Sequence, residues 1–285
     1  ITPKIEEYLR KKIERVYSDE AKTGIFEEDN PFLELISDDL LDTSVAVANR
    51  WKEEFIVSEN QKTNDLVFIQ FSKEGVDHFA FLRITLRETL THLGGEVDNP
   101  IKLTQNNLPG FGTGADEALV INLQSRKYHL IEKRIKYNGT FLNYFSENLL
   151  QAQPKISPKK SIKALEKTAQ RIAESFNTDD FQFQSKVKSA IFNHIEEENK
   201  LSPEKLADDL FDDNLTARLS FIDQVKEAIP EPVTFEEIDS TRQLKKFENQ
   251  KLSLSNGIEL IVPNSVYEDA ESVEFILNDN GTYSI

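Results

Sequence analysis

The sequence contains no cysteine, no methionine and no long hydrophobic run. The absence of cysteine excludes disulfides, thiolate zinc sites and cysteine nucleophiles. No apolar segment approaches the roughly 20 residues that a membrane-spanning helix needs, and residues 1–15 have the pattern of a charged amphipathic helix, not of a secretory signal. These features predict a cytoplasmic protein. The lack of methionine predicts an internal fragment of a longer chain, or modified methionines missing from the sequence.

Acidic residues dominate the chain, because 50 Asp and Glu outnumber 34 Lys and Arg and give a formal net charge of −16. Residues 126–163 are the exception: nine Lys or Arg stand against Glu132 and Glu147, a local charge of +7 that leaves −23 for the rest. A duplex attracts a protein through neutralised phosphates. We therefore expect this chain to contact DNA through one face, or to bind a partner that is not nucleic acid.

Hydrophobic periodicity predicts an α+β protein in two parts. The first domain, residues 1–150, is predicted to place helices around a mostly antiparallel sheet. Helical patterns cover residues 1–15, 30–41 and 43–57. Strand-like runs follow at 66–71, 78–86, 118–123 and 127–136, with a long irregular stretch at 94–114 between the two pairs. A further helix is expected from residue 138.

The second domain, residues 157–285, is predicted to be a helical region with terminal β-hairpins, preceded by a linker at 151–156. Ser157 and Pro158 supply a cap and a first helical residue. Further helices are expected at 180–198, 202–210 and 214–228. Asn256-Gly257 is a strong hairpin signal between strands at 251–254 and 258–262, and a second hairpin is expected at the end of the chain.

No motif indicates catalysis or metal binding. Residues 110–114 resemble a phosphate loop in their glycine spacing but lack its Gly-Lys-Ser/Thr ending, so a flexible loop is favoured. The four histidines show no metal-ligand spacing. Residues 202–228 could be mistaken for a helix-turn-helix, but the acidic pairs Asp208-Asp209 and Asp212-Asp213 would repel DNA there. We therefore expect no catalytic residue, no metal and no cofactor.

The basic stretch supplies candidate phosphate contacts in two groups. They are Arg126, Lys127, Lys133, Arg134 and Lys136 on a strand, and Lys159, Lys160 and Lys163 in the first turns of a helix. Lysines at that end oppose the helix dipole, so helix stability does not explain them, whereas a helix N-terminus with added lysines can bind an anion. The alternative is a solvated face that pairs with the acidic remainder, within one molecule or across a dimer.

Several segments, taken in order, resemble the bacterial nucleoid-associated NdpA family. They are Arg15-Val16-Tyr17-Ser18 with Lys22 and Gly24-Ile25-Phe26, the strand pair at 66–86, the aromatic run at 141–145, the helical stretch at 160–228 and Val233-Thr234-Phe235. Family members usually begin with an additional strand-like segment, and its absence before Ile1 predicts a truncated chain. The resemblance implies a cytoplasmic, dimeric protein of the bacterial chromosome, with DNA and type II topoisomerase as proposed partners of its relatives. It implies no catalytic residues.

We therefore predict a non-catalytic, nucleoid-associated protein that binds DNA weakly and without sequence preference, or that acts on a DNA-bound enzyme. A second hypothesis is an acidic adaptor that docks a basic partner such as a type II topoisomerase subunit, since complementary fields favour that encounter. A third is a metal-dependent nuclease, which needs carboxylates clustered around a metal. A phosphate-binding face requires the two basic groups to converge in space; if they diverge, a protein partner is favoured.

Overall fold

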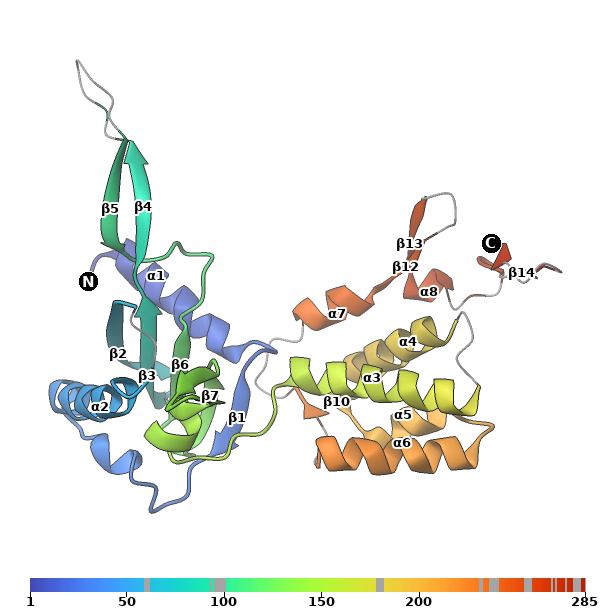
Figure 1. The fold of residues 1–285 in the computed structure, drawn as a ribbon, viewed down its shortest axis with the longest axis horizontal. Helices are drawn as coiled ribbons and strands as arrows, with labels where there is room; N and C mark the ends of the chain where they lie inside the picture. The colour runs from blue at the N-terminus through green and yellow to red at the C-terminus, as the bar shows by residue number, and fades with distance from the viewer. Residues whose placement is uncertain are drawn as a thin grey trace. The chain divides into compact units, whose positions relative to one another are not determined.

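The structure is a computed structural model that describes residues 1–58, 62–92, 94, 101–177, 182–230, 233–235, 241–253, 258–267, 269, 271–274, 276–278 and 283–284. The chain divides into two compact units, unit 1 at Ile1–Ser157 and unit 2 at Pro158–Ile285. The predicted α+β class is confirmed, with helices around an antiparallel sheet, then a helical region with C-terminal hairpins (Figure 1).

A five-stranded antiparallel sheet in the order β1-β7-β6-β3-β2 forms the centre of unit 1. Its strands are β1 Lys22–Ile25, β2 Asn64–Lys73, β3 Val76–Thr85, β6 Glu117–Asn122 and β7 Lys127–Ile131. The predicted hairpin of β2 and β3 is confirmed. Its turn places Glu74 and Gly75 at φ of 54° and 79°, the left-handed conformation that a two-residue hairpin turn requires.

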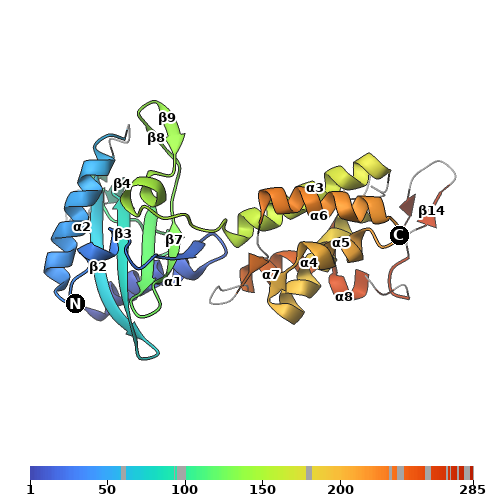
Figure 2. The same ribbon diagram turned by 90° about the horizontal axis from the view of Figure 1, so that it is seen from below.

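Helices cover both faces of this sheet (Figure 2). Phe79 and Phe81 of β3 pack on one side, in a core shared with helix α2 (Leu40–Phe55) and the π-helical segment η3 (Phe145–Leu149). Alternate residues of β3, such as Leu82, pack on the other side with helix α1 (Pro3–Glu14) and the 3-10 turn η1 (Arg15–Tyr17). Because neither face meets water, the central strands are continuous hydrophobic runs.

A second pair of strands leaves the body of unit 1. β4 (Arg87–His92) and β5 (Ile101–Asn107) form a two-stranded ribbon that projects away from the sheet in Figure 1. We call β4 and β5 together the arm. The predicted irregular stretch at 94–114 is wrong at residues 101–107, because this polar segment forms β5 by pairing with β4. Residues 93 and 95–100 lie outside the described part.

A buried lysine fixes the loop between the arm and β6. Lys12 of α1 is fully buried, and its Nζ donates to the carbonyl oxygen of Gly110 at 2.9 Å and to that of Thr113. The same Nζ lies 4.3 Å from the ring centroid of Tyr8. Burial lowers the pKa of Lys12, and the nearby charges of Arg15 and Arg87 lower it further. The glycine-containing loop is thus held in place by α1.

Unit 2 is mainly helical. Its helices are α3 Pro158–Phe176, α4 Phe183–Glu198, α5 Pro203–Leu210, α6 Leu215–Ala228, α7 Thr241–Phe247 and α8 Asn264–Tyr267. Its short strands are β10 Lys200–Leu201, β11 Val233–Thr234, β12 Asn249–Ser253, β13 Glu259–Pro263, β14 Ile276–Leu277 and β15 Tyr283–Ser284. α3 to α7 contribute to one hydrophobic core, in which Phe211 packs between Phe183 and Phe221.

The hairpin of β12 and β13 joins this core through a buried amide. Gln250 of β12 is fully buried, and its Nε2 donates to Asn264 Oδ1 at 2.7 Å and to the carbonyl oxygen of Ser185 on α4 at 3.3 Å. The predicted pairing of these strands is confirmed, while residues 254–257, which include the Asn-Gly turn, lie outside the described part.

The helix predicted at 30–41 is wrong. Only a 3-10 turn, η2 (Leu33–Leu35), forms there, and α2 begins at Leu40 because Asp39 caps it, accepting from the Leu41 amide at 2.7 Å. Asn30, the first residue of the predicted helix, instead donates from Nδ2 to the carbonyl oxygens of residues 150 and 151, both at 3.1 Å. Tertiary contacts therefore determine where this helix starts.

The single strand predicted at 127–136 is also wrong. The chain breaks after β7, and a separate hairpin follows, formed by β8 (Ile135–Tyr137) and β9 (Thr140–Leu142). The helix expected from residue 138 is reduced to η3 as a consequence.

A substitution at Gly24 tests the close packing of β1 against β7 at the edge of the sheet. An ideal Cβ at this position would overlap the buried Tyr128 ring across β1 and β7, lying 2.9 Å from Cε1. We expect Gly24→Ala to lower the free energy of unfolding of unit 1 by about 1–3 kcal/mol, the usual cost of overpacking. Urea unfolding followed by the fluorescence of Trp51, the only tryptophan in the sequence, measures this. Gly112→Ala is the control, because an added Cβ there meets nothing within 4 Å; equal stabilities of the two variants would contradict the close contact.

Candidate nucleic-acid interface

The first predicted group of cations lies around β7, and two of its members are already engaged in ion pairs. Arg126, in the turn before β7 at φ 59°, has Nη1 3.7 Å from Glu28 Oε2. Lys133, after β7, has Nζ 2.7 Å from Asp116 Oδ1. Lys127 is exposed at the start of the strand. The five residues of β7 separate the two ends of this group by about 17 Å, so the structure does not gather it at one point.

The charge of Lys133 is largely balanced by Asp116. Burial raises the pKa of Asp116, but hydrogen bonds from Lys133 Nζ and from the Thr85 amide, at 3.0 Å, outweigh burial and lower the pKa to about 2. Arg134 donates from Nη2 to the Phe141 carbonyl oxygen at 2.6 Å, and Lys136 is exposed on β8. These internal contacts occupy positive charges and hydrogen-bond donors that a bound phosphate would need.

The second predicted group lies on α3, and the structure extends it. Lys160 and Lys163 are exposed, whereas Lys159 is half-buried. At 100° per residue, Lys167 and Arg171 fall on the same side of the helix as Lys160 and Lys163, and both are exposed. We call these four residues the α3 basic stripe. The side of α3 that faces the core carries Ile162, Leu165, Ala169 and Ile172.

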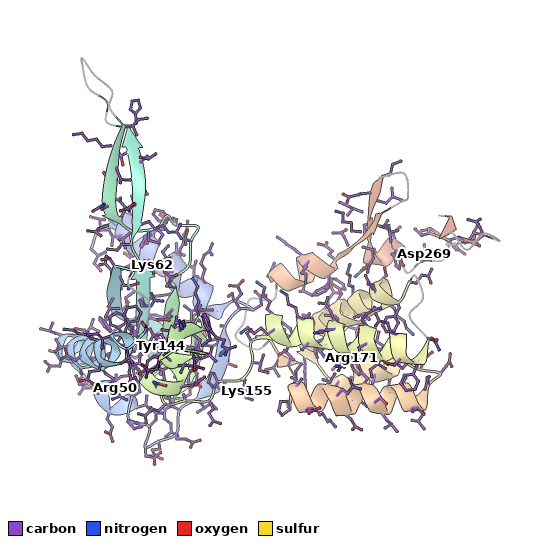
Figure 3. All side chains as sticks on the ribbon, viewed as in Figure 1. Arg50, Lys62, Tyr144, Lys155, Arg171 and Asp269 are labelled. Carbon is purple, nitrogen blue, oxygen red and sulfur yellow. The ribbon has the colours of Figure 1, made fainter. Side chains whose placement is uncertain are left out.

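The cations of the α3 basic stripe are not neutralised by carboxylates. Within the described ranges, no ion pair or side-chain hydrogen bond involves Lys160, Lys163 or Lys167, and Arg171 donates from Nη2 to the neutral Gln224 Oε1. Figure 3 marks Arg171 on α3. Our sequence reasoning ended the basic stretch at Lys163 and missed the last two members, although their spacing of three or four residues from one another was visible.

The eight predicted residues are divided between the two units. Five belong to unit 1 and three to unit 2, and within unit 1 they are spread along and beyond β7. In unit 2, Lys160 and Lys163 form one surface with residues that the prediction did not include.

Unit 2 also contains an acidic cleft of about 1130 Å³, lined by α4, the junction of α5 and α6, and part of residues 267–274. Its carboxylates are Glu197, Asp209, Asp212, Asp213 and Glu274. Lys186 lies 3.6 Å from Asp212, and His194 Nε2 lies 2.7 Å from Asp209. Among the residues described, no cation pairs with the other three carboxylates. The edges of the nearly buried Phe183 and Phe211 form an apolar part of the wall of the cleft.

A third polar cluster lies inside unit 1 and resembles an active site in composition. Arg83 Nε donates to Glu117 Oε2 at 2.6 Å across β3 and β6, and the Tyr144 hydroxyl donates to the same oxygen. Tyr144 in turn accepts from Trp51 Nε1 at 3.1 Å, and Figure 3 labels it in the interior of the unit. Burial raises the pKa of Tyr144, as does the neighbouring Glu117 charge.

This cluster is closed to substrates. Glu117 and Tyr144 are fully buried, and Arg83 is 2 % exposed. A general acid or base must come within hydrogen-bond reach of its substrate, which no solvent-borne molecule can do here. In the part of the chain that the structure describes, no group of three or more His, Cys, Asp or Glu side chains could hold a metal ion. We infer that the cluster stabilises the fold of unit 1.

The sequence matches the family described as "Nucleoid-associated protein YejK" over residues 2–285. No curated protein matches the sequence. Among the described helices, none has both the length and the apolar character needed to cross a bilayer.

The structural role of the buried cluster predicts a large effect of Glu117→Gln on stability. This substitution leaves the Arg83 guanidinium buried without a counter-ion, and we expect it to lower the free energy of unfolding by about 3–5 kcal/mol. Urea unfolding followed by Trp51 fluorescence measures the loss. Glu53→Gln is the control, because Glu53 is exposed and lies 4.0 Å from Arg50, a pair worth at most about 1 kcal/mol. A loss no greater than that of the control would refute the assignment.

Proposed function

The chain belongs to the family of the nucleoid-associated protein YejK, and from this membership we propose that it is a non-catalytic, cytoplasmic component of the bacterial nucleoid that contacts DNA phosphates as a homodimer. Family membership supports the association with the nucleoid. Direct contact with DNA, the dimer and the absence of catalysis are the proposal.

The observation that carries the proposal is the α3 basic stripe. From Lys160 to Arg171 it extends eleven residues, or about 17 Å along the helix. One DNA strand carries a phosphate every 3.4 Å or so of helix axis, so several phosphates lie within that length. Lysine ammonium groups contact phosphates without reading bases. The expected binding is therefore independent of sequence.

The remaining charge of the protein makes this contact weak. At a net charge of −16 the molecule as a whole is repelled by DNA, and only the local excess of cations on α3 favours approach. Arg126, Lys127, Lys133, Arg134 and Lys136 remain predicted contacts of lower strength, because carboxylates or carbonyl groups hold several of them.

The acidic cleft supports a second candidate function, that of an adaptor for a basic protein such as a type II topoisomerase subunit. Glu197, Asp213 and Glu274 have no cation partner among the described residues, and the exposed edges of Phe183 and Phe211 add a small apolar area to the wall of the cleft. A segment that carries both Lys or Arg and aliphatic side chains matches this lining, because complementary charge directs the encounter and apolar burial retains the segment.

Phosphate contact through α3 predicts a change in the salt dependence of DNA binding. The variant Lys160→Gln/Lys163→Gln/Lys167→Gln should bind a short duplex more weakly. The slope of log affinity against log salt should become shallower by about 3, since each phosphate contact contributes about 0.9. Fluorescence anisotropy of a labelled duplex at several salt concentrations measures both quantities.

A matched control has the same charge and the same number of substitutions. In Lys205→Gln/Lys226→Gln/Lys251→Gln, the altered lysines are those that pair with Glu198, Glu204 and Glu259. This control should keep the slope of the unaltered protein. A slope that falls equally in both variants would show a general charge effect, and no binding at low salt would exclude direct DNA contact.

The adaptor candidate predicts that a cationic peptide binds in the cleft. A short fluorescent peptide of alternating lysine and leucine should lose about tenfold in affinity for Glu197→Gln/Asp213→Asn/Glu274→Gln, because three carboxylates that attract it are removed. The control, Glu27→Gln/Asp29→Asn/Glu74→Gln, makes the same changes at exposed acids of unit 1. If both variants lose affinity to the same degree, the peptide responds to net charge and the cleft is not its site.

A further inference from the structure

The arm has one face that satisfies its own polar groups. Thr89 and Thr104 lie opposite each other with hydroxyl oxygens 3.1 Å apart, and the Thr91 and Thr104 hydroxyls are 3.0 Å apart. Asn107 Nδ2 donates to Thr89 Oγ1 at 2.9 Å and to the Thr104 carbonyl oxygen at 3.0 Å. This face is complete without a partner.

The opposite face of the arm is apolar and uncovered. Leu90 pairs with Leu103, and Ile101 pairs with His92 at the next position on the same side. The exposed fractions of Leu90, Ile101 and Leu103 are 73 %, 69 % and 56 %. We call these three residues the apolar face of the arm. Below them, Gln105 Nε2 donates to Glu88 Oε1 at 2.9 Å, so the apolar face ends where the arm joins the body.

The arm lacks the additional strands or packing that usually stabilise a two-stranded ribbon. An isolated two-stranded hairpin is at best marginally stable in water, and it requires further strands or packing on its hydrophobic face. In the described part of the chain, β4 and β5 pair only with each other, so both outer edges and the apolar face are available. Unpaired edges next to exposed leucines favour association.

We propose that the apolar face of the arm is the surface on which a second copy of this chain docks. Residues 87–107, which comprise the arm and the residues between its strands, carry Arg87 and Lys102 against Glu88, Glu96 and Asp98, a charge of −1, whereas the whole chain carries −16. The arm is therefore an element through which two such acidic molecules approach with little repulsion. The same near-neutral charge disfavours DNA, which binds through neutralised phosphates.

The proposed contact between two arms is symmetric. In a two-fold dimer the same patch serves both subunits, so the three apolar side chains of one arm meet the three of the other. This inference rests on the homodimer in the proposed function and assigns its surface. It also gives each assembly two α3 basic stripes, which raises the effective affinity for one duplex when both engage.

Sedimentation equilibrium of the full chain over a range of concentrations tests the assignment. The variant Leu90→Thr/Ile101→Thr/Leu103→Thr keeps the net charge and uses a residue that favours strands, so the arm is retained while its apolar face is lost. We expect the dissociation constant of the dimer to rise at least about tenfold. The control, Ile25→Thr/Ile261→Thr/Ile276→Thr, alters three strand isoleucines elsewhere that are 61 %, 70 % and 52 % exposed, and it should dimerise like the unaltered chain.

The possible outcomes separate this inference from the proposed function. Weaker dimerisation of the arm variant alone supports the assignment. An unchanged dimer in the arm variant overturns it and leaves the proposed homodimer intact, and if that variant then loses DNA binding, the arm belongs to the DNA interface. A chain that is monomeric at every concentration overturns both the homodimer and the assignment of its surface.

Discussion

The chain has a formal net charge of −16, and this negative charge influences what each surface of the protein can bind. At physiological salt the field of a charge is screened over about 8 Å, so the spacing of cations on a surface matters more to a nearby phosphate than the sum over the chain. In unit 1 several cations meet carboxylates at short range: Lys133 Nζ lies 2.7 Å from Asp116, and Lys22 Nζ lies 2.6 Å from Glu132. The four cations of the α3 basic stripe stand three or four residues apart, and among the described residues no carboxylate forms an ion pair with them. The same excess of negative charge is the reason for assigning the proposed self-association to the near-neutral arm.

The interior of unit 1 depends on a different ionic contact. Arg83 and Glu117 join β3 to β6 at the centre of the sheet, and Tyr144 brings the chain that precedes η3 to the same carboxylate. Trp51 extends the network to α2 through the Tyr144 hydroxyl. Side chains from three elements thus meet at one buried Glu117 oxygen, and α2 joins them through the Tyr144 hydroxyl. Such a network specifies a particular packing of α2 and η3 on the sheet, although apolar side chains provide most of the burial.

The sequence was sufficient for the fold class and for most strongly periodic segments, because alternation and helical spacing are local properties. It was insufficient where distant contacts decide. Asn30 and Asp39 are both good helix caps, and only the carbonyl groups near residue 150 show why Asn30 is used elsewhere. The arm was missed because Thr104 and Gln105 look like loop residues until their cross-strand partners are known. Lys167 and Arg171 were within reach of the helical spacing, whereas the ion pairs that engage Arg126 and Lys133 became visible only in three dimensions.

The burial of Lys12 affects how the protein responds to ionic strength. Its ammonium group is held by carbonyl oxygens and an aromatic ring, away from solvent. Mobile ions weaken contacts between exposed charges but reach a buried donor poorly. Rising ionic strength should therefore weaken the proposed contact between the α3 basic stripe and phosphate, while the loop at the base of the arm stays bound to α1. On this proposal, salt would release a polyanion from unit 2 without changing how α1 holds the loop next to the arm in unit 1.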